Sequence, residues 1–135
     1  MTTESINCMP GEKARALLEE IADWEWVTTI VIHGGSVFEF KGPFPRGSEG
    51  HGFYNLEGPL PGFHGHLNLE RVAHIRFQDK AHRGRESYAF VFEDSDGETI
   101  FKIFLGRDAN GELMPAQTQR FKQLQAQYQK DSLYE

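Results

Sequence analysis

The segment that decides the fold class is Ser87-Tyr88-Ala89-Phe90-Val91-Phe92-Glu93, followed by Asp96-Gly97 and Thr99-Ile100-Phe101-Lys102-Ile103-Phe104-Leu105. Both apolar runs are rich in aromatic and β-branched residues, which fit the pleated surface of a sheet. The short polar connection with its Asp-Gly pair is typical of a hairpin turn. We therefore predict two adjacent antiparallel strands here.

A second hairpin is predicted nearer the N-terminus. Residues 26–33 are largely β-branched, and Gly34-Gly35 separates them from the run at residues 37–41. Shorter candidate strands lie at residues 53–56 and 74–78. The stretches at residues 42–52 and 57–65, which are rich in Gly and Pro, show no periodicity, so we predict loops there.

Helical periodicity is confined to the two ends of the chain. After Pro10, apolar residues recur at the spacing of one helix face: Ala14, Leu17, Leu18 and Ile21. Pro115 opens a final helix that carries Phe121, Leu124 and Tyr128 on one side. We predict an α+β fold in a single domain over residues 1–135, with a large antiparallel β-sheet built from hairpins and flanked by an N-terminal and a C-terminal helix.

Composition excludes several classes of function. The chain of 135 residues has a net charge of −6, which opposes the phosphate attraction that nucleic-acid binding needs. Cys8 is the only cysteine, so neither an intrachain disulfide nor a cysteine-based metal site can form. No run approaches the ~20 apolar residues of a membrane span, and the N-terminus has no signal-peptide pattern. We expect a cytoplasmic protein without membrane insertion.

Six histidines and Tyr54 are the residues most suited to chemistry. His64-Gly65-His66 would place two rings on one face of an extended segment, but no third ligand follows at a diagnostic spacing. The local pattern alone favours an exposed hairpin residue at His33, and for Tyr54 it favours packing into the core over a place in a cleft. The chain has no nucleophile elbow and no phosphate-binding loop, so nucleophilic catalysis finds little support and we assign no catalytic residue.

Taken together, several motifs resemble a known family. They are residues 26–33, Val37-Phe38-Glu39-Phe40-Lys41-Gly42-Pro43-Phe44-Pro45, Gly52-Phe53-Tyr54-Asn55-Leu56, Gly65-His66-Leu67 and Phe101-Lys102-Ile103-Phe104-Leu105-Gly106-Arg107-Asp108. In this order they resemble the cytosolic haem-utilisation carriers of the ChuX/HutX type. The resemblance runs from about Ala22 to Phe121.

The resemblance implies a homodimeric protein that binds haem b for intracellular storage, transfer or utilisation. It places His33, His66 and Tyr54 as candidate ligands of the haem iron, with Arg85 among the residues that bind the cofactor through its propionates. The resemblance thus implies a binding protein rather than an enzyme, and two alternatives stay open at this point. One is an enzyme that degrades or reduces the tetrapyrrole, and the other is a protein-interaction module that binds no haem.

Two segments depart from the family's usual pattern. Where members carry Arg-Pro-Phe-Met-Gly-Arg, this chain has Lys80-Ala81-His82-Arg83-Gly84-Arg85 and keeps the final Gly-Arg. The cysteine and small residues usual after Gly-His-Leu are replaced by Val72 and His74. We expect these changes to alter one wall of the ligand pocket.

Overall fold

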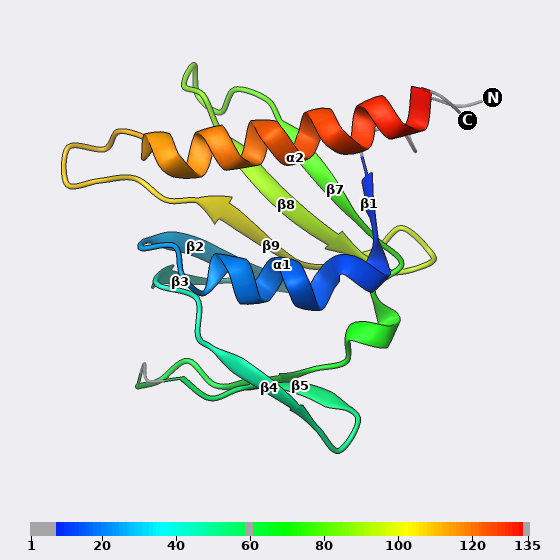
Figure 1. The fold of residues 1–135 in the computed structure, drawn as a ribbon. Coiled ribbons are helices and arrows are strands. Elements are labelled where there is room, and N and C mark those ends of the chain that lie inside the picture. Colours follow the sequence, from blue (N-terminus) through cyan, green and yellow to red (C-terminus); the bar gives the residue numbers. More distant parts are fainter. Residues whose placement is uncertain (1–7, 59–60, 134–135) are drawn as a thin grey trace.

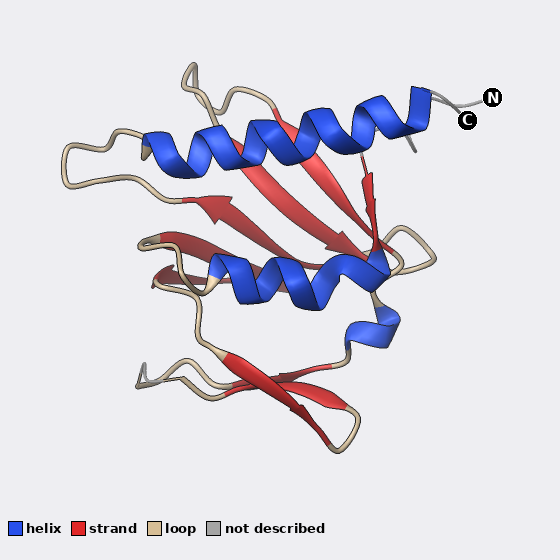
Figure 2. Ribbon diagram, in the orientation of Figure 1, coloured by secondary structure: helices blue, strands red, loops and turns tan. Residues whose placement is uncertain are grey.

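The structure, a computed structural model, describes residues 8–58 and 61–133, with side chains as far as residue 129. Pro59 and Leu60, in the second predicted loop, lie outside the described residues. The elements in chain order are β1 (Cys8–Pro10), η2 (Gly11–Lys13), α1 (Ala14–Ile21), β2 (Val27–His33), β3 (Ser36–Gly42), β4 (Gly47–Gly50), β5 (Phe53–Leu56), β6 (Gly65–Leu67), η3 (Leu69–Arg71), β7 (His74–Asp79), β8 (Tyr88–Glu93), β9 (Thr99–Leu105) and α2 (Pro115–Leu133). This arrangement confirms the predicted α+β class (Figure 2).

The large sheet has six antiparallel strands in the order β1-β7-β8-β9-β2-β3. Both predicted hairpins are present, as β2–β3 and β8–β9. Between β2 and β3, Gly34 and Gly35 take φ values of 58° and 80°, and two successive positive φ values are what a type I′ hairpin turn requires. The edge strand β1 was not predicted, because three residues ending in proline carry no strand periodicity.

A second, three-stranded sheet in the order β4-β5-β6 corrects the loop prediction for residues 42–52. Residues 47–50 form β4, which pairs antiparallel with β5 through a turn in which His51 and Gly52 have φ values of 56° and 84°. The strand sequence Gly-Ser-Glu-Gly has no apolar alternation, so the strand was missed. It is held by backbone pairing and lies close to β5, since a Cβ at Gly47 would be 2.7 Å from the Tyr54 ring.

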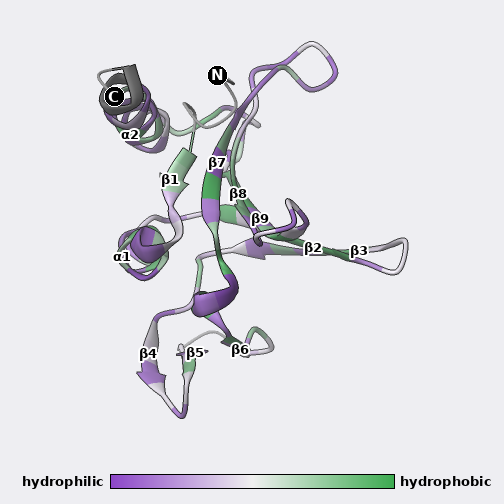
Figure 3. Cartoon of the chain, turned by 90° about the vertical axis from the view of Figure 1, so that its right-hand side faces the viewer, coloured by the Kyte–Doolittle hydropathy of each residue, from purple (hydrophilic) through white to green (hydrophobic). Residues whose placement is uncertain are grey.

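Both α-helices cover the same face of the six-stranded sheet (Figures 1 and 3). On α2, Phe121 is fully buried, and its ring centroid lies 5.4 Å from that of Phe77, 5.2 Å from Tyr88 and 5.0 Å from Phe90. The apolar face predicted for this helix is therefore the face that closes the core. None of the helices in the described ranges combines the length and hydropathy needed to span a bilayer.

The opposite face of the same sheet has no helix over it, and we call it the open face. Because side chains alternate along a strand, Phe101, Ile103 and Leu105 of β9 face the core, whereas Lys102 and Phe104 face the open side. The register places Thr28 and Ala89 beside Phe104 on that side.

Replacement of Phe121 by alanine tests the role of α2 in the core. We expect Phe121→Ala to lower the free energy of unfolding by about 3–5 kcal/mol, because it leaves a cavity among three aromatic rings. Urea denaturation measures the change, and Gln119→Ala on the exposed side of the same helix is the matched control, with an expected effect within about 0.5 kcal/mol. Equal losses for both variants would contradict this account of the core.

Candidate functional site

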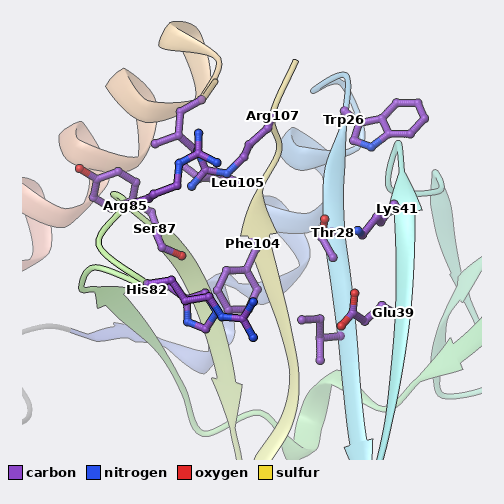
Figure 4. A pocket seen from close by; sticks show the side chains of 14 residues that line it. Trp26, Thr28, Glu39, Lys41, His82, Arg85, Ser87, Phe104, Leu105 and Arg107 are labelled. Carbon is purple, nitrogen blue, oxygen red and sulfur yellow. The ribbon is translucent and has the colours of Figure 1, made fainter. Parts of the chain in front are cut away.

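A groove of about 640 Å³ lies on the open face, at the end of the sheet where β8 begins and β9 ends (Figure 4). Its floor contains Phe104 of β9 together with Thr28 and Ile30 of β2. Glu39 and Lys41 of the edge strand β3 line one side. A volume of this size is in the range of pockets that take small molecules and cofactors.

The loop between β7 and β8 lines the other side of the groove. It closes in a tight turn, in which the His82 N–H donates to the Arg85 carbonyl oxygen at 2.8 Å and the Arg85 N–H donates back at 3.1 Å. The two central residues, Arg83 and Gly84, have φ values of 55° and 79°. This is one of the two segments in which the sequence departs from the family pattern, and it lines the groove, whereas Val72 and His74 of the other segment do not.

Two arginines meet at the end of the groove. Arg85 Nη2 donates to the Gly111 carbonyl oxygen at 2.6 Å, and Arg107 Nη1 donates to the same oxygen at 3.2 Å. Arg107 also donates to the carbonyl oxygen of Glu86. Backbone oxygens thus orient both guanidinium groups, and within the described residues neither group forms a salt bridge.

Positive charge is concentrated in this groove although the whole chain has a net charge of −6. Its lining includes Lys41, Arg83, Arg85 and Arg107 against a single carboxylate, that of Glu39. In the described part of the chain, none of these four cations lies in a salt bridge. The groove therefore offers unneutralised charge that favours an anionic ligand.

The charge continues along the open face beyond the groove. Lys102, two residues before Phe104 on β9, donates from Nζ to Gln78 Oε1 at 3.2 Å. Burial lowers the pKa of Lys102, and the neighbouring charges of Arg76 and Lys80 lower it further, while Glu93 opposes them. Arg76 is itself paired with Glu93, since its Nε and Nη2 each lie 3.2 Å from Glu93 Oε2, so part of this positive charge is neutralised.

Apolar surface borders the same groove. Trp26, just before β2, is 48% exposed, and Phe104 is only partly buried. The arrangement is suited to a ligand with a flat apolar body and negatively charged groups at one edge, because aromatic faces stack on the body while guanidinium groups bind the anions.

The predicted ligand residues lie outside this groove. His33 is exposed at the end of β2, beside the Gly34-Gly35 turn. His66 is exposed on β6, where its Nδ1 lies 2.7 Å from Asn55 Oδ1 and its ring meets the edge of Phe53. An amide oxygen accepts hydrogen bonds, so in the neutral imidazole this contact favours the tautomer with the proton on Nδ1, which leaves the Nε2 lone pair available to a metal.

Tyr54 is buried in the core, with 1% of its surface exposed. Burial raises the pKa of its phenol, and the nearby Glu19 carboxylate raises it further, whereas Arg15 and the Gly47 backbone oppose the shift. Its hydroxyl completes no hydrogen bond within the described residues. In this conformation the phenolate is unfavourable and the oxygen is closed to a ligand.

The structure does not bring the three predicted iron ligands together within one chain. Tyr54 pairs with Leu67, and Asn55 pairs with His66, so Tyr54 and His66 project from opposite faces of the three-stranded sheet. Of the predicted residues, Arg85 alone lines the groove. No group of three or more His, Cys, Asp or Glu side chains suited to a metal ion is found among residues the structure describes.

Sequence reasoning missed much of the groove. Arg107, Lys41 and Trp26 stand in the family motifs but were given no role, and His82 was considered only as one of the six histidines and within the Lys80–Arg85 segment. The sequence did contain a signal for this surface. Side chains alternate along residues 99–105, which places Lys102 and Phe104 on the sheet face that the helices do not cover. Arg107 itself could not be assigned, since its approach to Arg85 depends on the loop that carries Gly111.

Comparison with known proteins agrees with this architecture. The intracellular heme transport protein HutX of Vibrio cholerae is 45% identical over 125 residues, which are 93% of this chain and 65% of that protein. The chain thus spans slightly less than two thirds of that relative's length. A crystal structure of a protein from Erwinia carotovora has 33% identity and a TM-score of 0.83, covering 90% of this chain and 75% of that one.

The solved structure of the heme binding protein ChuX is similar to this chain as well, with 32% identity and a TM-score of 0.80 over 96% of this chain and 78% of its own. The family model for haem utilisation ChuX/HutX matches residues 7–124. With the match extending from β1 into α2, and with the groove formed by strands inside it, this chain belongs to the ChuX/HutX family of haem-utilisation proteins.

Proposed function

We propose that this protein binds haem b and carries it in the cytoplasm as a non-enzymatic step of haem utilisation. The observation that carries the proposal is a groove with an aromatic floor and unpaired cations, in a chain that belongs to a haem-utilisation family. The relatives named as a heme transport protein and a heme binding protein support a carrier over an enzyme.

Haem fits the chemistry of the groove. Phe104 and Trp26 contact the porphyrin, and Arg85 binds a propionate by a charge-assisted hydrogen bond. Most of the affinity comes from removing the porphyrin faces from water, at ~25 cal/mol per Å² of apolar surface. A single bond to iron, which competes with water, contributes less affinity and more specificity.

The candidate iron ligands are His66, His33 and Tyr54. None of them lines the groove of its own chain, so ligation of a haem bound there requires a residue of a second protomer or a movement of the strand that carries the ligand. His66 is the first candidate, because Asn55 orients the imidazole and leaves Nε2 available. His33 offers an exposed imidazole at a strand end. Tyr54 requires β5 to move away from the core before its oxygen reaches iron, so we rank it after the two histidines.

A homodimer completes the proposal. Among the described strands, β3 has no partner on its outer edge, and the β2–β3 hairpin exposes Ile32 (46%), Val37 (56%) and Phe38 (53%). An exposed apolar edge strand invites pairing, and a two-fold pairing with a second copy closes it. His33 at the hairpin tip would then lie against the partner protomer, which offers a way for residues of two chains to share one haem.

Titration with ferric haem tests the function directly. We expect a saturable change of the Soret band with a stoichiometry near one haem per chain, because the proposed haem site occurs once in the described part of each chain. Absorption spectroscopy provides the measurement, with an unrelated acidic protein of similar size as the control. Non-saturable partitioning that equals the control would overturn haem binding.

The bound complex also separates a carrier from an enzyme. On addition of an electron donor in air, we expect the iron to be reduced and reoxidised while the porphyrin absorption persists. Loss of the Soret band together with a bilin product would instead show that the protein degrades haem.

Substitution of the proposed ligands tests which side chain binds the haem iron. We expect His66→Ala to shift the ferric Soret and charge-transfer bands while the affinity changes less than about tenfold, or 1.4 kcal/mol. Tyr54→Phe shifts the bands if the phenolate binds iron, and His33→Ala acts more weakly or only in combination. His64→Ala is the matched control for an exposed neighbouring imidazole. An unchanged spectrum in the triple variant would exclude all three residues.

Tyr54→Phe has a second readout that separates packing from ligation. Since the buried hydroxyl completes no hydrogen bond in the described chain, its removal is expected to raise the free energy of unfolding of the haem-free protein by about 1 kcal/mol. A marked loss of stability in urea denaturation would show that the hydroxyl stabilises the core after all.

The oligomeric state tests the dimer. Light scattering on the purified protein should give twice the chain mass, and Phe38→Glu should give the monomer, because a charge in the contact between edge strands would be desolvated. Phe53→Glu is the control, since Phe53 is similarly exposed (42%) but lies on the three-stranded sheet. A monomer at high concentration of the unmodified protein would refute the dimer.

A further inference from the structure

We propose that Arg85 and Arg107, both held on the Gly111 carbonyl oxygen, form a clamp for the carboxylates of the tetrapyrrole. The protein then selects its ligand by free propionate groups, whatever the metal at the ring centre. This inference rests on the proposed haem-binding function and assigns to Arg107 a role that the sequence did not suggest.

Two like charges are held side by side at the end of the groove. Both guanidinium groups donate to one oxygen, at 2.6 Å and 3.2 Å, so the two cations are held close to each other. No carboxylate in the described residues forms a salt bridge with either. Elsewhere in the described chain, arginines such as Arg46 and Arg120 are paired with acidic side chains. An anion bound between Arg85 and Arg107 would relieve their repulsion.

The shared acceptor is fixed by its own loop. Asp108 Oδ1 accepts hydrogen bonds from the N–H groups of Asn110 at 2.8 Å and Glu112 at 3.0 Å, and Gly111 takes a φ of 77° that favours glycine. The backbones of Arg107 and Leu113 form an isolated antiparallel β-bridge at the base of this loop. The clamp is therefore organised before ligand arrives, which limits the entropy lost on binding.

Arg83 adds a third cation at a strained position. Its φ of 55° lies in the left-handed region, where the first central residue of a type I′ turn is commonly asparagine or glycine. Its side chain makes no hydrogen bond or salt bridge with any described residue and lines the groove. A strained residue at a binding loop is a recognised mark of function, and here the side chain supplies charge.

The surroundings identify the class of anion. Phe104 and Trp26 border the same groove, so an anion attached to a flat apolar body would use both the charge and the aromatic surface. The two propionates of haem leave one edge of the ring on short flexible arms, and a planar guanidinium binds a carboxylate through two parallel hydrogen bonds. A free phosphate would use the charge but leave the aromatic floor uncovered.

The test compares ligands and variants in one titration series. The ligands are ferric haem, metal-free protoporphyrin IX and protoporphyrin IX dimethyl ester, all in the same mild detergent. The variants are Arg85→Gln, Arg107→Gln, their combination, and Arg71→Gln as the control, since Arg71 is exposed on η3 and away from the groove lining. Binding is followed by the Soret band for haem and by fluorescence for the porphyrins.

We expect the double variant to bind haem and protoporphyrin IX at least about 30-fold more weakly, with the Soret maximum of its haem complex unchanged. The unmodified protein should prefer the free acid to the dimethyl ester by a similar factor, and the double variant should lose this preference. Arg71→Gln should match the unmodified protein in all three titrations.

Arg83→Asn provides an independent readout. Asparagine accepts the positive φ more readily, so this variant should unfold at the same or higher urea concentration and still bind haem several-fold more weakly. A purely structural role for Arg83 would leave the affinity unchanged.

Failure of the clamp is distinguishable from failure of the function. If the unmodified protein binds no haem, the proposed function is wrong. The clamp is wrong and the function stands if the unmodified protein binds haem but has the same affinity for the dimethyl ester as for the free acid. The same holds if the double variant keeps the affinity of the unmodified protein for haem. A shifted Soret maximum in the double variant would show that these arginines affect the surroundings of the haem iron and not only the propionates. This outcome would also overturn the clamp.

Discussion

The structure depends on one-sided burial of the six-stranded sheet. Phe121 of α2 packs among the rings of Phe77, Tyr88 and Phe90, and this aromatic layer fixes the helix against the central strands. Since strand side chains alternate between faces, burying one set commits the other set to the open face. The groove exists because the two α-helices cover the same side of the sheet (Figure 3).

A single buried amide connects this core to the groove. Gln117 of α2 accepts a hydrogen bond from the Gly106 N–H and donates to the Trp26 carbonyl oxygen, both at 2.9 Å. A Cβ at position 106 would lie 1.7 Å from that carbonyl oxygen, so glycine is required where β9 ends beside β2. The helix that closes the core therefore also sets the spacing of the strand ends that carry Trp26 and Arg107.

The sequence by itself determined the regular elements that have strong local signals. Both long hairpins could be predicted, because alternating aromatic and β-branched runs flank turns rich in glycine. The two helices near the ends of the chain could be predicted from the spacing of their apolar residues. The order of the motifs along the chain was enough to identify the family. Prediction failed at β4, where Gly-Ser-Glu-Gly has no side-chain pattern and the strand is defined by its pairing with β5.

Only the tertiary structure decided which chemical groups meet. Tyr54 and His66 belong to neighbouring motifs, yet strand register sends them to opposite faces of one sheet. Arg85 and Arg107 are far apart along the chain, yet two loops bring them to one carbonyl oxygen. Local sequence encodes the preferences of backbone and burial, which act over a few residues. The approach of Arg85 and Arg107 depends on strand register and on the conformation of two loops. Both are determined only when the whole core packs.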